Sequence, residues 1–291
     1  MPDRGAPIVN VAEIKALLAE HGLRPHKSLG QNFLVDPIHL ERIAEAADLD
    51  RNDLVLEVGP GLGALTEYLV ARAGQVVAVE LDAGFAAILR QRFAGVPNFH
   101  LVHADILTVD IPALLAPFAP SGEPLHYKVV ANLPYVITSA ALRHILENTP
   151  PPELLVVLVQ REVAQRIVAR PGDLSLLAVS VQFYGEPEIV ARIPAGAFYP
   201  VPSVDSAILR VTPHPERAVR VEDSEAFFTV VRAGFGQKRK QLKNALASGL
   251  SRPVAQVEAD LRAAGIDPRR RAETLSLEEW ARVMAELECD A

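Results

Sequence analysis

The chain has 291 residues, of which 49% are hydrophobic and 22% charged, and its formal net charge is −7. This composition is typical of a globular protein and excludes a chain that is mainly disordered. Its single cysteine, Cys289, excludes a disulfide framework and a cysteine-based zinc site within one chain. The N-terminus lacks the apolar run of a signal peptide, and no stretch of 18 residues is free of charge or proline. We therefore expect a cytoplasmic protein that needs no metal and does not enter a membrane.

Positive charge is concentrated in one part of the chain. Residues 232–271 carry 10 Lys and Arg against 3 Asp and Glu, a net charge of +7, whereas residues 1–231 carry −9 and residues 272–291 carry −5. A basic block inside an acidic protein is either a surface that faces phosphates or a solvated helical face. Charge alone leaves both interpretations open.

The first 170 residues alternate between short apolar runs and helical patterns. A helix is predicted over 11–21, and a second begins at Pro37, with Asp36 as its N-cap, and runs to 47. Strands are then predicted at 54–58, 76–80, 99–102, 127–131 and 154–159, separated by helices at 63–73, 83–93, 110–116, 138–147 and 161–169. This alternation predicts a parallel, doubly wound sheet of the Rossmann-like α/β class.

The pattern changes after this alternation. Two apolar runs at 175–184 and 204–211 lack a long helix between them, so we expect an antiparallel extension of the sheet. Beyond Pro213 only helical patterns remain, at 224–235, 238–248, 253–264 and 276–288. We therefore expect an α/β domain over residues 1–212 and a small helical domain over residues 213–291.

A glycine-rich turn follows the first strand of the predicted sheet. In EVGPGLGALT the glycines stand at 59, 61 and 63, where the strand gives way to a helix. Glycines let the backbone approach a ligand closely, although they can also serve the turn alone. A dinucleotide loop has its third glycine at the sixth position, which Ala64 occupies here, and Glu57 would repel a pyrophosphate. The loop therefore favours S-adenosylmethionine over NAD.

Two further acidic residues lie at or just after the ends of the next two predicted strands. Glu80 ends the second strand, 21 residues after Gly59, where a carboxylate can accept both ribose hydroxyls of a nucleoside. Asp105 follows the third strand and is placed to reach an adenine amino group. For each residue the simpler alternative is a helix cap or a solvated loop position.

The fourth strand ends in Asn132-Leu133-Pro134-Tyr135, at the edge of the sheet where ligands of such folds bind. The amine of adenine is a poor nucleophile because its lone pair is delocalised into the ring. The Asn132 amide oxygen and the carbonyl of Leu133 or Pro134 can accept its two N–H bonds and localise that lone pair. Tyr135 offers a ring on which the base can stack. A strand-ending turn with a packed tyrosine is the alternative.

In this order, the motifs resemble those of the KsgA-type small-subunit ribosomal RNA adenine N6,N6-dimethyltransferases, siblings of the Erm methyltransferases. The resemblance covers nearly the whole chain through KSLGQNFL at 27–34, EVGPGLGALT at 57–66, VAVELD at 77–82, HADIL at 103–107, NLPYVIT at 132–138 and FYPVPSVDSA at 198–207. It implies four methyl transfers to two adjacent adenines near the 3′ end of 16S rRNA, in a partly assembled small subunit. The segment before Lys27 has no assigned role.

The resemblance also implies the site residues. Phe198 would hold a flipped adenine against Tyr135, so that the catalytic set is Asn132, Leu133, Pro134, Tyr135 and Phe198. The expected cofactor-binding residues are Gln31, Asn32, Leu34, Glu57, Gly59, Gly61, Gly63, Glu80, Leu81, Asp105, Ile106 and Asn132.

Within the helical segment, a helix over 238–248 would bring Lys238, Arg239, Lys240 and Lys243 into one patch of positive charge for RNA phosphates. Arg269, Arg270 and Arg271 form a second basic spot in a loop. We expect a monomer that binds ribosomal RNA. Three alternatives stay open: an Erm-like enzyme acting on large-subunit RNA, a protein that serves mainly as an assembly checkpoint, and, more distantly, a NAD dehydrogenase.

Overall fold

The computed structural model describes residues 10–25, 31–120 and 122–288. The first four residues of KSLGQNFL and Cys289 therefore lie outside the described residues. The chain divides into two compact units, the first comprising residues 1–164 and 188–213 and the second residues 165–187 and 214–291. The helical unit thus takes residues 165–187 from the middle of the chain in addition to its C-terminal part.

A seven-stranded sheet forms the centre of the first unit, in the order β4-β3-β2-β5-β6-β9-β7. Strands β2 to β6 pair in parallel, and β9 pairs with β6 in the antiparallel direction. The strands are β2 (Leu54–Val58), β3 (Gln75–Glu80), β4 (Phe99–His103), β5 (Lys128–Asn132), β6 (Leu154–Gln160), β7 (Gly185–Ile193) and β9 (Ser206–Pro213). The predicted doubly wound α/β architecture is confirmed.

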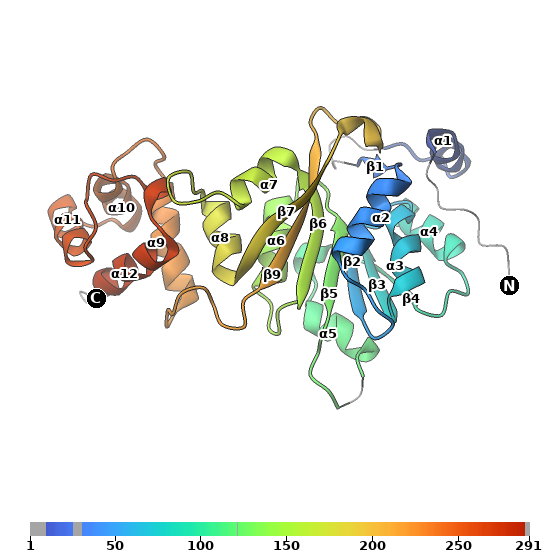
Figure 1. Cartoon of the computed structure of the whole chain (residues 1–291), viewed down its shortest axis with the longest axis horizontal. Helices are drawn as coiled ribbons and strands as arrows, with labels where there is room; N and C mark the ends of the chain where they lie inside the picture. Colours follow the sequence, from blue (N-terminus) through green and yellow to red (C-terminus); the bar gives the residue numbers. More distant parts are fainter. Residues whose placement is uncertain (1–9, 26–30, 121, 289–291) are drawn as a thin grey trace. The chain divides into compact units, whose positions relative to one another are not determined.

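Most strand residues of this sheet are apolar, and helices bury them by packing on the sheet. Val55, Val76 and Val130 belong to one cluster with side chains of α2, α3 and α4, which Figure 1 shows grouped along the β2–β4 part of the sheet. Their chain neighbours point to the opposite face, because side chains alternate along a strand. In the chain up to Tyr184 the α-helices are α1 (Val11–Glu20), α2 (Pro37–Ala46), α3 (Ala64–Arg72), α4 (Ala83–Arg92), α5 (Ile111–Leu115), α6 (Thr138–Leu146), α7 (Arg161–Ile167) and α8 (Leu176–Tyr184), the last of which belongs to the second unit.

A separate two-stranded sheet joins two of the sequence motifs. Strand β1 (Phe33–Leu34) pairs antiparallel with β8 (Phe198–Tyr199), so that Phe33 is opposite Tyr199 and Leu34 is opposite Phe198. The backbone N–H of Val35 extends the pairing by donating to the Ala197 carbonyl at 2.9 Å. Two segments about 165 residues apart along the chain are thereby fixed side by side.

The predicted strand at 175–184 is wrong. Residues Leu176–Tyr184 form α8, and the Ser175 hydroxyl caps the helix by accepting the Ala178 N–H at 3.2 Å. A continuous apolar run fits a buried helix as well as a buried strand, so periodicity does not separate them. The antiparallel extension is confirmed for β9, which pairs with β6. The next strand of the sheet is β7, which follows α8 in the chain and in which buried and exposed residues alternate.

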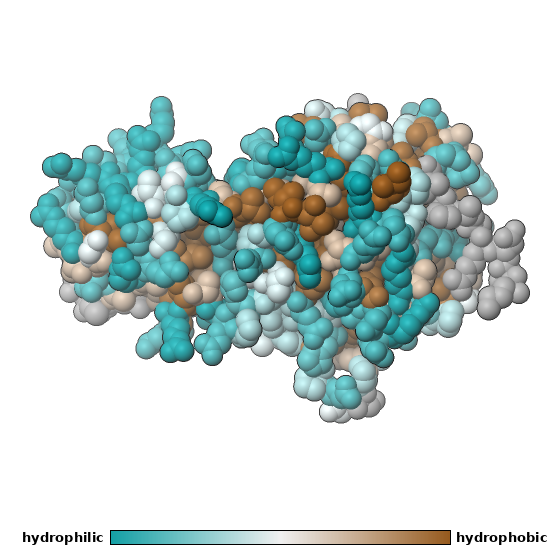
Figure 2. All heavy atoms as spheres, viewed as in Figure 1, coloured by the Kyte–Doolittle hydropathy of each residue, from teal (hydrophilic) through white to brown (hydrophobic). Residues whose placement is uncertain are grey.

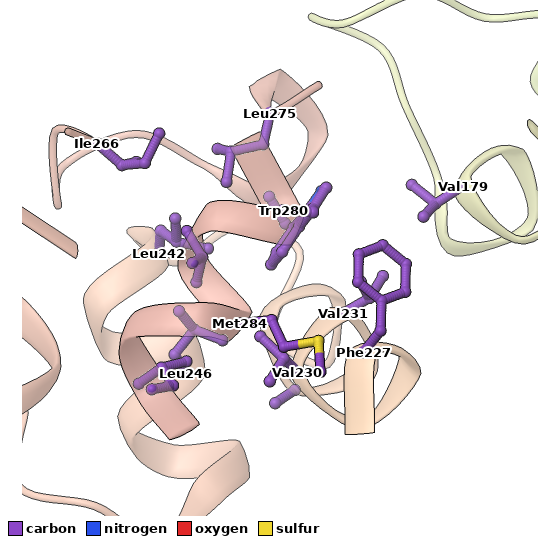
Figure 3. Packing of buried hydrophobic residues seen from close by; sticks show 14 of the residues in the cluster. Val179, Phe227, Val230, Val231, Leu242, Leu246, Ile266, Leu275, Trp280 and Met284 are labelled. Atoms are coloured by element: carbon purple, nitrogen blue, oxygen red, sulfur yellow. The ribbon is translucent and has the colours of Figure 1, made fainter. Parts of the chain in front are cut away.

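The second unit has its own apolar core. Its C-terminal helices are α9 (Ser224–Phe235), α10 (Leu242–Leu250), α11 (Val254–Ala263) and α12 (Leu277–Glu288). Trp280 lies at the centre with Leu275 and Met284 beside it, and Val179 of α8 lies next to the ring of Phe227 (Figure 3). A Cβ atom at Gly234 would come within 2.3 Å of the Trp280 ring, so this position admits only glycine. The visible face of this unit is largely hydrophilic (Figure 2).

Candidate functional site

A cavity of about 530 Å³ lies where the parallel strands β2, β3 and β5 end. The parallel direction brings the carboxyl ends of these strands to one edge, so the loops that follow them converge there. The volume lies in the range of small-molecule and cofactor sites. The predicted site residues that line the cavity are Gln31, Asn32, Leu34, Glu57, Gly59, Gly61, Glu80, Leu81, Asp105, Ile106, Asn132, Leu133, Pro134 and Tyr135.

The glycine turn forms one wall. Gly59, Gly61 and Gly63 all have positive φ angles of 59–83°, a region that favours glycine. Gly59 and Gly61 line the cavity, but Gly63 does not. A Cβ atom at Gly63 would approach the Phe93 ring to 2.6 Å, so this glycine allows α3 to pack closely against α4. The structure therefore gives Gly63 a packing role at the start of α3.

Glu57 is a buried carboxyl group at the base of the cavity, 1% exposed. The Thr66 hydroxyl donates to its Oε2 at 2.7 Å. Burial raises the pKa of Glu57 to about 8, and the nearby Glu80 carboxylate acts in the same direction. A buried acid with one hydrogen-bond donor is costly to ionise, and a cation bound in the cavity would favour the ionised form.

Glu80 and Asp105 are oriented by backbone N–H groups. The two Glu80 oxygens accept from the N–H of Gly61 at 3.0 Å and of Asp82 at 2.8 Å, while burial raises the pKa of its carboxyl. Asp105 caps the short helix that begins at Ile106, accepting the Leu107 N–H at 3.0 Å. Asp105 is thus both the helix cap of the simpler interpretation and a residue of the cavity wall.

Asn132 has its side-chain orientation set by the QNFL segment. Its Nδ2 donates to the backbone carbonyl of Asn32 at 3.2 Å. With the amide nitrogen engaged in this bond, the amide oxygen is the end that can accept a hydrogen bond from a substrate. The sequence motif therefore contributes a fixed acceptor to the cavity.

Hydrogen bonds fix the Pro134 carbonyl and the Tyr135 hydroxyl. The Pro134 carbonyl already accepts the Ile137 N–H at 3.1 Å and the Thr138 hydroxyl at 3.3 Å. The Tyr135 hydroxyl forms a 2.6 Å hydrogen bond with the hydroxyl of buried Ser206, and burial raises the pKa of the phenol. The bond with Ser206 anchors the hydroxyl end of the Tyr135 side chain, which lines the cavity.

Phe198 lies in the apolar core and not in the cavity wall. Its side chain is 2% exposed, belongs to the core cluster with Leu34 and Ile208, and is not part of the cavity wall. The structure therefore does not bring Phe198 to face Tyr135.

Several wall residues were not anticipated from the sequence. Ile14, Phe33, Leu62 and Phe85 line the cavity together with the predicted residues. They come from four separate segments, and an apolar residue in a helix or loop gives no sequence signal that separates a cavity wall from ordinary core.

The basic residues of the helical unit are arranged differently from the expectation. The helix predicted over 238–248 begins only at Leu242, so exposed Lys238, Arg239 and Lys240 lie in the turn between α9 and α10. Lys243 instead pairs with Glu258 at 2.7 Å. In the second basic spot Arg270 is engaged by both oxygens of Glu279, at 2.6 and 2.8 Å.

The loop 268–270 lies against the start of α10. The N–H groups of Leu242 and Lys243 donate to the carbonyls of Arg270 and Pro268, at 2.7 and 3.3 Å. The two basic spots are therefore neighbours, and Lys238, Arg239, Lys240, Arg269 and Arg271 are their exposed members. We call Lys238–Lys240 the basic turn.

Within the described residues, every helix is too short or too polar to span a bilayer. The same residues contain no group of three or more His, Cys, Asp or Glu side chains placed to hold a metal ion.

The doubly wound sheet, the glycine turn and the acidic residues at the ends of β2 and β3 and after β4 define a Rossmann-like methyltransferase. The family model for ribosomal RNA adenine dimethylases matches residues 22–288, and the chain belongs to this family. It is an S-adenosylmethionine-dependent ribosomal RNA methyltransferase. The cavity suits this cofactor, because buried carboxyl groups and apolar walls match a cationic nucleoside.

Relatives match along almost the whole chain. A protein named Ribosomal RNA small subunit methyltransferase A from Dehalococcoides mccartyi is 52% identical over 271 residues, covering 93% of this chain and 91% of its own. The protein of the same name from Moorella thermoacetica is 48% identical, with 94% and 96% covered.

Solved structures are also similar. The 23S rRNA methyltransferase ErmE is 34% identical with a TM-score of 0.64, covering 88% of this chain and 99% of its own. A dimethyladenosine transferase from Plasmodium falciparum, 21% identical over 87% of this chain and 96% of its own, shares the fold with a TM-score of 0.70.

Stability should depend on pH through Glu57. The folded protein keeps this proton up to a pH of about 8, whereas the unfolded chain loses it near the ordinary pKa of 4.5. The free energy of unfolding therefore falls between these two pH values, because unfolding then releases a proton. We expect Glu57→Gln to be more stable than the native chain by about 1–3 kcal/mol near pH 7.5, and equally stable near pH 4.

Urea unfolding between pH 4 and 8 measures this difference. Glu45→Gln, which alters an exposed carboxylate, is the matched control and should leave the curve unchanged. A loss of stability in Glu57→Gln at pH 7.5 would contradict the free-energy cost assigned to burying Glu57.

The same Glu57→Gln protein should bind S-adenosylmethionine more weakly.

Proposed function

We propose that this protein transfers four methyl groups from S-adenosylmethionine to the N6 atoms of two adjacent adenines near the 3′ end of 16S rRNA. The substrate is a partly assembled small ribosomal subunit, and the protein acts as a monomer in the cytoplasm, where subunits are assembled. The small-subunit relatives, at 48–52% identity, support this substrate over the large-subunit alternative, for which ErmE is 34% identical.

The observation that carries the proposal is the fixed amide of Asn132 in the cavity wall. Bound S-adenosylmethionine supplies a methyl group on a sulfonium sulfur. The residues Glu57, Glu80 and Asp105 would hold its polar groups, with Gln31, Asn32, Leu34, Gly59, Gly61, Leu81 and Ile106 around them. Methyl transfer then depends on alignment of the adenine nitrogen, which the Asn-Leu-Pro-Tyr segment provides.

Two acceptors activate the adenine amine. The Asn132 Oδ1 accepts one N–H, and a backbone carbonyl accepts the other, so the nitrogen lone pair is localised for attack. Of the two carbonyls considered, that of Pro134 already accepts two hydrogen bonds, which supports Leu133 as the second acceptor. The methylated amine is acidic and loses its proton to solvent, so no general base is required.

Tyr135 supplies the stacking surface for the base. Its ring lines the cavity and is held by Ser206. In this proposal Phe198 is the second aromatic contact of the base, which its ring reaches by leaving its core position.

The helical unit, with the basic turn, docks the RNA. Exposed Lys238, Arg239 and Lys240 are available to phosphates, whereas Lys243 already has Glu258 as its partner. Such contacts supply affinity without sequence preference, which comes from RNA shape and the flipped base.

The substrate can be tested directly. Labelled S-adenosylmethionine is supplied with unmethylated small subunits, with large-subunit RNA and with protein-free RNA, and the modified nucleoside is identified by mass. We expect dimethyladenosine from the small-subunit particle alone. Label in large-subunit RNA would assign an Erm-like activity, and absence of label with the cofactor bound would favour a checkpoint role.

Asn132→Ala should lower the rate of methyl transfer by about 10²–10³-fold, because one acceptor of the amine is lost. Binding to the small subunit should remain nearly intact, since the side chain makes no phosphate contact in this proposal. Single-turnover transfer and subunit pelleting measure the two properties. Asn52→Ala, in an exposed turn before β2, is the control. An equal loss of binding would contradict the catalytic role.

Replacing Lys238, Arg239 and Lys240 together with Ala should weaken RNA binding and reduce the slope of log K against log salt by about 2 to 3. Lys243→Ala should leave this slope nearly unchanged, because Lys243 is already paired within the protein. Binding titrations at several salt concentrations measure both variants. Equal changes in the two slopes would refute the distinction.

A further inference from the structure

The N-terminal helix α1 precedes residues 22–288, which the family model matches, yet it reaches the cofactor cavity. Asn10 begins the helix by accepting the Glu13 N–H at 2.8 Å. Ile14 and Leu18, four residues apart, lie on one face and are 1% and 4% exposed. Of these two, Ile14 also lines the cavity.

The partners of α1 are themselves walls of the cavity. Ile14 and Leu18 share an apolar cluster with Phe33 of β1, Leu62 of the glycine turn and Phe85 of α4. All three of these partners line the cavity, and the rings of Phe33 and Phe85 meet edge to face with centroids 5.6 Å apart. Just after α1, the Leu23 side chain lies close to Gly84. A Cβ atom at position 84 would come within 2.6 Å of the Leu23 side chain.

One charged residue of α1 makes a further contact, and a second influences Arg92 through its charge. The Lys15 Nζ lies 5.4 Å from the centre of the Tyr199 ring in β8. Arg92 of α4 donates to the Leu62 carbonyl and pairs with Glu67 at 3.3 Å. Burial lowers the pKa of Arg92, and the negative charges of Glu67 and Glu13 oppose this shift. Glu13 therefore contributes from α1 to the charge balance around the glycine turn.

We propose that α1 is an integral wall of the S-adenosylmethionine pocket, with Ile14 as a cofactor-binding residue, and that docking of α1 is coupled to cofactor binding. Each cavity residue that α1 touches comes from a different segment, so the helix holds these segments together on one side of the cavity. Removing the Ile14 side chain takes apolar surface away from the wall and loosens the helix. The inference rests on the cofactor alone and does not depend on which RNA is methylated.

The test compares Ile14→Ala with Ile145→Ala, which removes an equally buried isoleucine from α6 outside the cavity wall. Isothermal titration with S-adenosylmethionine should give a dissociation constant about 3- to 30-fold weaker for Ile14→Ala and an unchanged value for Ile145→Ala. Thermal unfolding shows that both variants are folded at the titration temperature. Unchanged affinity in Ile14→Ala, or equal losses in both variants, would overturn the proposal.

Hydrogen exchange on the native chain gives a second test that requires no variant. Saturating S-adenosylhomocysteine should slow amide exchange across residues 11–20, because a docked helix opens less often when the cavity is filled. Slowing confined to the glycine turn and the strand ends, with α1 unaffected, would also overturn the proposal.

Discussion

The parallel pairing of β2 with β3 and β5 is the constraint on which the rest of this structure depends. It places the ends of three strands at one edge, and with them Glu57, Glu80 and Asn132. None of these residues is near another along the chain. Their meeting follows from the direction of the strands, and the order of the strands decides that the Asn-Leu-Pro-Tyr segment at the end of β5 faces the glycine turn after β2.

The site carries buried polar groups that a purely structural core would avoid. Glu57 and Glu80 lie close enough for the charge of one to raise the pKa of the other, and both are almost inaccessible to solvent. Such an arrangement opposes folding, and a cationic ligand relieves it. Asn132 is oriented in a different way. The backbone carbonyl of Asn32, in a distant motif, accepts a hydrogen bond from its amide nitrogen, which leaves the amide oxygen available to the cavity.

Fold class and most of the cavity were accessible from sequence because they rest on local rules. Apolar strand-length runs, glycines at a strand end and acids at the next strand ends each have a direct physical meaning, whereas Gln31, Asn32 and Leu34 were expected only from the family resemblance. Together, 14 of the predicted site residues line the cavity. The prediction at 175–184 was wrong because a continuous apolar run carries no period. The basic patch was misplaced because the residues between Phe235 and Leu242 form a turn, which interrupts the predicted helix.

By itself, the sequence determined the alternating architecture, the kind of cofactor and the place of the Asn-Leu-Pro-Tyr segment at a strand end, since these depend on residue type and on spacing within single elements. Only the tertiary structure decided which residues meet. It paired Phe33 with Tyr199, fixed Tyr135 through Ser206, buried Phe198 in the core and brought α1 to the cofactor cavity. These contacts join segments far apart in the chain, and the side chains that make them are selected by packing, which leaves no periodic signal in the sequence.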